Sequence, residues 1–248
     1  MYAAGLTHQG QVRQQNQDAI FYTTGPIGML PNLFIVADGM GGHKAGDVAS
    51  RKGVDWFCDY IAQEMHVPSF IDLLLTTAHK VNQELYDLAK ANPQDMHGMG
   101  TTFVACVLQE GRADVIHVGD SRAYIITPTD IKQITNDHTY AEEMFRAGHI
   151  TAEEARNHPR KHHLTRVLGF DPHVKLDGFF HSIEKGASLL LCTDGLSNML
   201  NDDMLMEIVN REGYVEHRVE MLIDAANARG GTDNISAVLV DLRKGEAT

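Results

Sequence analysis

Short runs of apolar, β-branched residues alternate along the chain with longer stretches in which apolar residues recur at helical spacing. Strands are predicted at residues 19–23, 33–37, 102–108, 114–118, 122–126, 188–192 and 235–241. Helices are predicted at residues 54–65, 71–88, 202–212 and 215–229. Ser69 is the expected N-cap of the second helix, and Asn92 with Pro93 its end.

The order of these elements indicates the fold class. The predicted helices come in pairs between runs of adjacent strands, whereas a doubly wound parallel sheet alternates one strand with one helix. The pattern therefore favours an α+β fold of antiparallel sheets with helices outside. Three closely spaced strands, at 102–108, 114–118 and 122–126, predict a meander. Because no linker or repeat divides the 248 residues, we expect one domain covering residues 1–248.

The segment 137–166 differs from its surroundings. It is polar and rich in histidine, and it contains two short predicted helices, the second beginning at Thr151 with Glu154 completing a capping box. Such an insertion has few core residues. Two interpretations stay open: a mobile surface excursion, or a flap beside a functional site.

The composition limits the function classes. With 21 Lys and Arg against 33 Asp and Glu, the formal net charge is −12, which argues against nucleic acid or an anionic membrane as partners. The three cysteines, Cys58, Cys106 and Cys192, form no CxxC pair. The sequence has neither a leader-like apolar segment nor a run long enough to cross a membrane. A cytoplasmic protein is expected.

Four aspartates stand at strand ends, each followed by Gly, Ser or Asn: Asp38, Asp120, Asp194 and Asp233. A single such residue is ordinarily a turn residue, because Asp accepts local backbone N–H groups. Four carboxylates converging on one region would raise one another's pKa values unless a divalent cation neutralised them. Because the donors are oxygens and no His or Cys stands at metal-binding spacing, the expected cation is Mg²⁺ or Mn²⁺.

The glycine-rich stretch that follows Asp38 does not match a nucleotide-binding loop. The dinucleotide fingerprint needs glycine where Lys44 stands, and a P-loop needs Lys and Ser or Thr where Asp47 and Val48 stand. These glycines are instead expected to let the backbone approach a metal or an anion. Arg13, considered alone, is most simply a surface residue.

Seven sequence blocks occur in an order that resembles one known family. They read GLTHQGQVRQQNQDAI, VADGMGGHKAG, GTTFVACVL, VIHVGDSRAYII, LTRVLG, LCTDGLSNML and GGTDNISAVLV, and they span residues 5 to 241. The chain is similar to the metal-dependent protein phosphatases, the type 2C Ser/Thr phosphatases, and looks like their bacterial branch. The resemblance implies two packed antiparallel sheets flanked by helix pairs, an α-β-β-α sandwich with a flap at 137–166. It also implies hydrolysis of phosphoserine and phosphothreonine by a water held between two Mn²⁺ or Mg²⁺ ions.

The resemblance implies roles for the acidic residues. Asp38 would bridge both ions, the carbonyl of Gly39 would bind the second, and Asp194 and Asp233 would complete the first. Asp120 resembles a ligand of a third, weaker ion that Asp194 would share. The remaining acidic position, Asp18, would hold metal-bound waters.

The resemblance also implies substrate-binding residues. Arg13 matches an arginine that clamps the phosphoryl group, and His43 and His162 stand near the expected site; both histidines could equally be solvated polar residues. One position departs from the family: its block often reads Asn-Glu-Asp, whereas this chain has Gln17 before Asp18. Glutamine removes a charge near the second ion, so altered metal affinity is expected rather than loss of chemistry.

Three functions remain open at this point: an active protein Ser/Thr phosphatase opposing Ser/Thr kinases, a pseudophosphatase that only binds a partner, and a two-metal hydrolase of another phosphoester. Because Asp38, Asp194 and Asp233 are all present, the first is favoured over the second. The expected partners are phosphorylated proteins, including a Ser/Thr kinase and its substrates, and the expected state is a monomer. The sequence does not identify the physiological phosphoprotein or the kinase.

Overall fold

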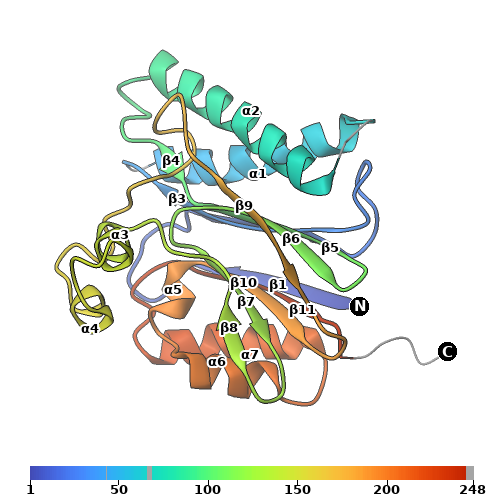
Figure 1. Ribbon diagram of the computed structural model, residues 1–248. Helices are drawn as coiled ribbons and strands as arrows, with labels where there is room; N and C mark the ends of the chain where they lie inside the picture. Colours follow the sequence, from blue (N-terminus) through green and yellow to red (C-terminus); the bar gives the residue numbers. More distant parts are fainter. Residues whose placement is uncertain (43, 66–68, 244–248) are drawn as a thin grey trace.

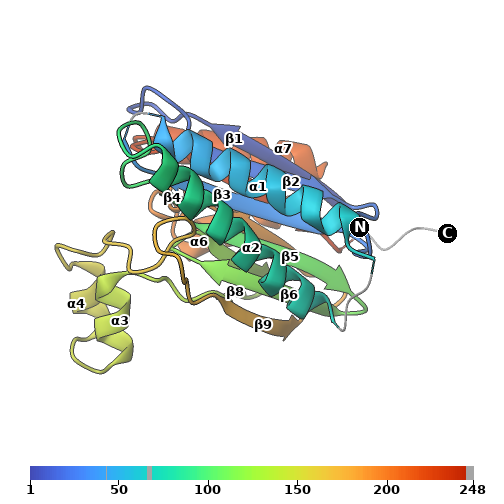
Figure 2. The same ribbon diagram turned by 90° about the horizontal axis from the view of Figure 1, so that it is seen from above.

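Two antiparallel sheets lie face to face, and a pair of helices covers the outer face of each (Figures 1 and 2). This arrangement is observed in a computed structural model that describes residues 1–42, 44–65 and 69–243. It is the α-β-β-α sandwich expected from the sequence. The fold-class prediction is therefore confirmed.

The first sheet joins the two ends of the described chain. Its spatial order is β1 (Tyr2–His8), β11 (Ile235–Asp241), β10 (Ser188–Cys192), β7 (Arg122–Ile126) and β8 (Ile131–Gln133). Its outer face is covered by α6 (Asp202–Val209) and α7 (Val215–Ala228), as Figure 1 shows. The short α5 (Asp194–Ser197) follows β10 directly. The sheet thus places the segments after β10 and before β11 side by side.

The second sheet is built from the intervening strands. Its spatial order is β2 (Asp18–Thr23), β3 (Leu33–Met40), β5 (Phe103–Gln109), β6 (Arg112–Val118) and β9 (Asp177–Ser182), and β4 (Gly100–Thr101) pairs with the end of β3. Two long helices cover this sheet, α1 (Ala45–Gln63) and α2 (Phe70–Ala91). The Ser69 side chain accepts a hydrogen bond from the backbone N–H of Asp72, which confirms it as the N-cap of α2.

Apolar side chains fill all three spaces between the four layers. Alternate residues of each central strand point to opposite faces, so both faces of a strand such as β3 are buried. Phe34 and Val36 face the other sheet, where they join Leu191 and Val238. Ile35 faces the opposite way and packs with the α1–α2 pair. This double burial explains why the central strands read as continuous apolar runs.

The predicted meander is wrong. β5 and β6 form a hairpin, but β7 belongs to the other sheet. The chain changes sheets in the turn after β6, where Gly119 has a φ of +100°, a conformation that favours glycine. The strands β1, β8 and β9 were not predicted either, because each has an exposed or mixed burial pattern instead of an apolar run.

The segment 137–166 contains α3 (Tyr140–Arg146) and α4 (Ala152–Arg156), which project from one side of the sandwich (Figure 2). Thr151 and Glu154 form the expected capping box at the start of α4. The two ends of the segment meet where Thr139 pairs with Leu164 in an antiparallel bridge. Its helices therefore stand on a narrow base beside the end of the sandwich.

Candidate active site

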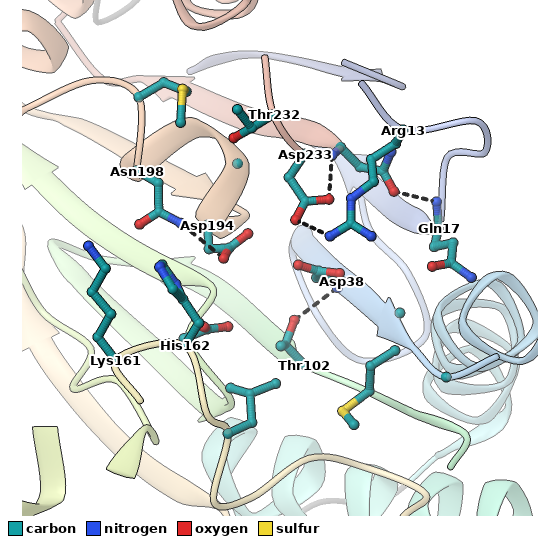
Figure 3. A pocket seen from close by; sticks show the side chains of 18 residues that line it. Arg13, Gln17, Asp38, Thr102, Lys161, His162, Asp194, Asn198, Thr232 and Asp233 are labelled. Carbon is teal, nitrogen blue, oxygen red and sulfur yellow. Dashed lines mark hydrogen bonds and ion pairs between the residues drawn. The ribbon is translucent and has the colours of Figure 1, made fainter. Parts of the chain in front are cut away.

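A pocket of about 690 Å³ opens where the two sheets meet at one end of the sandwich. Figure 3 shows that side chains from both sheets and from the segment 137–166 point into it. It brings together Arg13, Asp38, Gly39, Asp120, His162, Asp194 and Asp233 from the residues that the sequence singled out. His43 lies outside the described residues. The pocket therefore unites positions up to 220 residues apart in the chain.

Asp38 is held rigidly at the end of β3. Its backbone N–H donates to Oγ1 of Thr102 at 2.8 Å, and its carbonyl accepts from the backbone N–H of Thr102 at 2.9 Å and from Oγ1 of Thr101 at 3.0 Å. On its other side, β2 places Asp18 directly opposite in the register. Because these bonds use only the backbone of Asp38, its carboxylate stays available to the pocket.

Asp194 and Asp233 come from the other sheet. Asp194 opens α5, and its Oδ2 accepts from Nδ2 of Asn198 at 3.0 Å, whereas its Oδ1 is buried without a hydrogen-bond partner among the described residues. Asp233 precedes β11; its Oδ1 accepts from the backbone N–H of Asn234 at 2.8 Å, and its Oδ2 accepts from Nη2 of Arg13 at 2.7 Å. One hydrogen bond thus orients the carboxylate of Asp194, and two orient that of Asp233.

Asp18 lies behind the pocket, between the sheets. Its Oδ2 accepts hydrogen bonds from the hydroxyls of Thr193 at 2.9 Å and Ser236 at 2.6 Å, and its Oδ1 is buried without a partner in the part of the chain that the structure describes. Ser236 lies in β11 of the first sheet and Thr193 directly follows β10 of that sheet, whereas Asp18 belongs to the second sheet. The residue therefore ties the two halves of the site together.

Burial and mutual repulsion both disfavour the charged forms of the carboxylates in the pocket. Burial raises the pKa of Asp38, and the nearby charges of Asp18 and Asp194 raise it further. Burial likewise raises the pKa values of Asp120 and Asp194, and it brings that of Asp18 to about 7. A buried carboxylate cluster of this kind is stabilised when hard divalent cations replace the missing protons. The carboxylate oxygens of the pocket, including those of Asp18 and Asp194 that have no partner within the described residues, fit such cations.

The glycines after two of the aspartates serve backbone packing. A Cβ on Gly39 would lie 2.0 Å from the carbonyl oxygen of Gly46 in α1, and a Cβ on Gly195 would lie 1.9 Å from that of Asn234. Neither gap admits a side chain. At these two positions, the close approach of two backbone segments is by itself enough to require glycine after the aspartate.

The pocket residues that the sequence did not single out include Thr102, Lys161 and Asn198. Asn198 stands one helical turn after Asp194, and this spacing was the available signal for its role as a hydrogen-bond donor. Nothing in the sequence separates Lys161 from its polar neighbours. Thr102 is found only through the pairing of β3 with the chain near β4 and β5.

The sandwich fold and the acidic pocket with an arginine at its rim define a class of protein: a metal-dependent hydrolase that acts on a phosphoryl group. The protein phosphatase 2C family model matches residues 5–239, and the chain belongs to this family.

Known relatives span nearly the whole chain. The serine/threonine phosphatase stp of Listeria monocytogenes is 36% identical over 246 residues, covering 97% of this chain and 96% of the relative. The crystal structure of Stp1 from Staphylococcus aureus has a TM-score of 0.90 at 33% identity, covering 98% of this chain and 95% of that one. The catalytic domain of the phosphatase PstP, in complex with two manganese ions, has a TM-score of 0.81 at 31% identity and covers 97% of both chains. Divalent-metal dependence is thus supported for this chain.

Proposed function

We propose that this enzyme hydrolyses phosphoserine and phosphothreonine in proteins with a water activated between two Mn²⁺ or Mg²⁺ ions. It is a protein serine/threonine phosphatase by family; the ion count and the water are the proposed parts. One observation carries them, namely that buried carboxylates from both sheets converge on a pocket beside Arg13. The alternative of a pseudophosphatase is disfavoured because Asp38, Asp194 and Asp233 all reach this pocket.

We assign a separate role in binding the ions to each acidic residue of the site and to the Gly39 carbonyl. In the proposed assignment Asp38 would serve both ions, the Gly39 carbonyl one of them, and Asp194 and Asp233 the other, while Asp18 would orient water from behind. Asp120 would bind a third ion. The cations, when bound, supply an acidified water nucleophile and neutralise charge on the phosphoryl group.

Arg13 is placed to bind the substrate. Its side chain is 53% exposed and lines the pocket, and it gives one N–H to Asp233. A guanidinium carries five donors in a planar fork, so further N–H groups remain for phosphoryl oxygens. Asn198 and Thr102 hold Asp194 and the backbone of Asp38, so the reacting group would meet an already ordered site.

The wider setting is also proposed. We infer a cytoplasmic signalling enzyme, acting as a monomer on phosphoproteins that include a Ser/Thr kinase and its substrates, and we treat 137–166 as a flap within a single domain, 1–248. Among the described residues, no helix is long and apolar enough to span a membrane. The absence of a nucleic-acid partner rests on the net charge of −12.

The direct test compares substrates at saturating Mn²⁺. Phosphoserine and phosphothreonine peptides, a phosphotyrosine peptide, a nucleoside monophosphate and p-nitrophenyl phosphate are assayed with the same enzyme. Peptides of the first two kinds are expected to show the highest kcat/KM. A preference for the nucleotide would instead support the two-metal hydrolase of another phosphoester.

Substitution of Arg13 separates phosphoryl binding from the chemistry of the ions. A charge-assisted contact contributes ~1.5 to 3 kcal/mol, so Arg13→Ala is expected to lower kcat/KM roughly tenfold to a hundredfold. Arg13→Lys recovers part of the loss, because an ammonium supplies charge without the fork. Steady-state kinetics on one phosphopeptide measures the series. Arg211→Ala, which removes an exposed cation paired with Glu207, is the matched control, and equal activity of the Arg13 and Arg211 variants would contradict the role.

Substitutions in the flap are expected to affect large substrates selectively. A second cavity, of about 460 Å³, runs between the flap and the sandwich and is lined by Phe145 and Arg156. The double variant Phe145→Ala with Arg156→Ala should raise KM for a phosphoprotein about tenfold, since two contacts of ordinary strength are lost. Turnover of p-nitrophenyl phosphate should not change, because this substrate is too small to reach the cavity.

The control for the flap variant is Phe170→Ala, an exposed aromatic outside this cavity. Replacing His158 to His163 is a less selective test, because Lys161 and His162 also line the catalytic pocket. If the double variant lost activity equally on both substrates, the flap would have no substrate-selecting role.

A further inference from the structure

A second cluster of titratable side chains lies at the base of the flap, outside the catalytic pocket. His117 from β6, His138 after β8 and Asp177 from β9 each offer one polar atom within 4.8 Å of the others. The two histidines are almost fully buried. None of the roles proposed above uses these residues.

His138 bonds to three segments of the chain at once. Its backbone N–H donates to the carbonyl of Gly119 at 2.8 Å, and its Nδ1 accepts from the N–H of Gly119 at 3.1 Å. On the other side of the ring, Nε2 lies 3.2 Å from Oδ2 of Asp177. Its carbonyl accepts from the backbone N–H of Thr165 at 2.9 Å. One residue therefore links the turn before Asp120, the start of β9 and the returning end of the flap.

These bonds fix the tautomer of His138. Because Nδ1 accepts the N–H of Gly119, the ring proton sits on Nε2, where it is donated to Asp177. A cation bound at Nε2 would have to displace this proton, and Nδ1 would then lose the bond to Gly119. The hydrogen bonds therefore indicate that His138 holds neighbouring segments of the chain in place and does not bind a metal ion.

His117 packs beside His138 but does not share the hydrogen bonds of His138. The two rings pack with their centroids 4.6 Å apart, and the polar contact of His117 is to the backbone of Ser121, whereas the hydrogen bonds to Gly119 and Asp177 belong to His138. Burial lowers the pKa of His117 to about 3, and burial also lowers that of His138. Both rings are neutral, so His117 offers a matched comparison of nearly equal burial and identical chemistry.

Further hydrogen bonds and an ion pair hold the base of the flap together next to His138 and Asp177. Tyr140 donates its backbone N–H to the carbonyl of His163 at 2.9 Å, and the hydroxyl of Thr165 donates to Glu143 at 2.7 Å. Arg166 forms an ion pair with Asp177 at 3.3 Å. The carboxylate that accepts the hydrogen bond from His138 therefore also binds the last residue of the flap. Any displacement of His138 would thus change the positions of both Asp120 and the base of the flap.

We propose that His138 is a positioning residue that fixes the Asp120 turn and the base of the flap to each other, so that cation binding at Asp120 and binding of large substrates depend on one side chain. The inference rests on the proposed role of Asp120. It concerns a residue that touches neither substrate nor ion.

The test uses the full chain in three variants: His138→Leu, His138→Gln and His117→Leu. His138→Leu loses both side-chain hydrogen bonds, so the Mn²⁺ concentration giving half-maximal hydrolysis of p-nitrophenyl phosphate should rise roughly fivefold to thirtyfold. KM for a phosphopeptide should rise as well. His138→Gln, which retains one acceptor and one donor, should recover part of both effects. His117→Leu should show neither.

A readout without metal or substrate accompanies the kinetics. Hydrogen exchange in the metal-free protein is followed at the amide of Gly119, which His138 protects through Nδ1. Exchange should accelerate in His138→Leu and stay near the wild-type rate in His117→Leu. A merely structural role would instead lower stability and accelerate exchange similarly in both leucine variants.

A double substitution separates the effect of His138 on cation binding from its effect on the binding of large substrates. In an Asp120→Asn background, His138→Leu should no longer shift the Mn²⁺ requirement, while its effect on KM for the phosphopeptide persists. An undiminished shift in that background would overturn the proposal, as would equal effects of the two leucine variants. Stabilisation of wild type but not His117→Leu by Zn²⁺ would make the cluster a metal site instead. If wild type itself lacked metal-dependent hydrolysis, the proposed function would fail, whereas the exchange result at Gly119 would still stand.

Discussion

Asp194→Asn is expected to lower kcat/KM at least about a thousandfold. Cation chemistry supplies several kcal/mol of transition-state stabilisation, and ~4 kcal/mol corresponds to roughly a thousandfold in rate. Asp194 lines the pocket with one buried oxygen that has no partner among residues 1–42, 44–65 and 69–243, so the substitution weakens the carboxylate best placed to bind a cation. Steady-state kinetics on a phosphothreonine peptide at saturating Mn²⁺ measures the loss.

The stability of this variant distinguishes a site residue from a structural one. In the metal-free protein, Asp194 adds negative charge to a buried cluster, and the nearby charge of Asp194 is one cause of the raised pKa of Asp38. Removing that charge should leave the thermal midpoint unchanged or higher, even as activity disappears. Asp203→Asn, an exposed position on α6, is the control for loss of a carboxylate. A folded Asp194→Asn protein with normal turnover would remove this residue from the site.

Removal of divalent cations is expected to abolish activity, and addition of Mn²⁺ or Mg²⁺ to restore it. The same ions should stabilise the fold, because they bind the native cluster and not the unfolded chain. At a concentration a hundred times the dissociation constant, the stabilisation is ~2.7 kcal/mol, which for this size of protein corresponds to roughly 5 to 10 °C in Tm. Thermal unfolding with and without Mn²⁺ measures it.

The stabilisation should grow with pH. In the metal-free protein the carboxylates of the pocket have raised pKa values, so their protonated forms favour the folded state at low pH and this stability is lost as pH rises. For Asp18 the window runs from its ordinary value of 3.8 to about 7. Because Mn²⁺ replaces the lost protons, the shift in Tm should be small near pH 5 and largest above pH 7. Full turnover in the presence of a chelator, or a shift independent of pH, would contradict the metal centre.

The central strands and the long helices were predictable because both of their patterns arise from burial. β3 and β5 are buried on two faces and read as apolar runs, and α2 repeats its apolar residues on one face. By contrast, β1 and β9 have many exposed residues, which gives no such run. Helix α1 begins at Ala45 rather than near Val54, because its first turns pack small residues such as Gly46 against β3.

The site was predictable as a set of residue types but not as a geometry. Asp38, Asp194 and Asp233 stood out because each follows or precedes a strand, and the family resemblance added Arg13. Their meeting depends on how the two sheets are paired, which local patterns do not contain. The wrong meander illustrates the limit: one turn, at Gly119, decides whether β7 extends the second sheet or joins the first.

The division of the site between two sheets has a consequence during protein synthesis. Asp18 belongs to an early strand, but one of its hydroxyl partners, Ser236, lies 218 residues later. The ribosome adds residues one at a time, so the Asp18–Ser236 bond and the Asp233 side chain do not exist until almost all of the described chain has been made. A nascent or truncated chain would therefore carry an incomplete cation site however well its first sheet-forming segments had folded. Phosphatase activity would begin only with the finished fold, which keeps incomplete chains from acting on phosphoproteins.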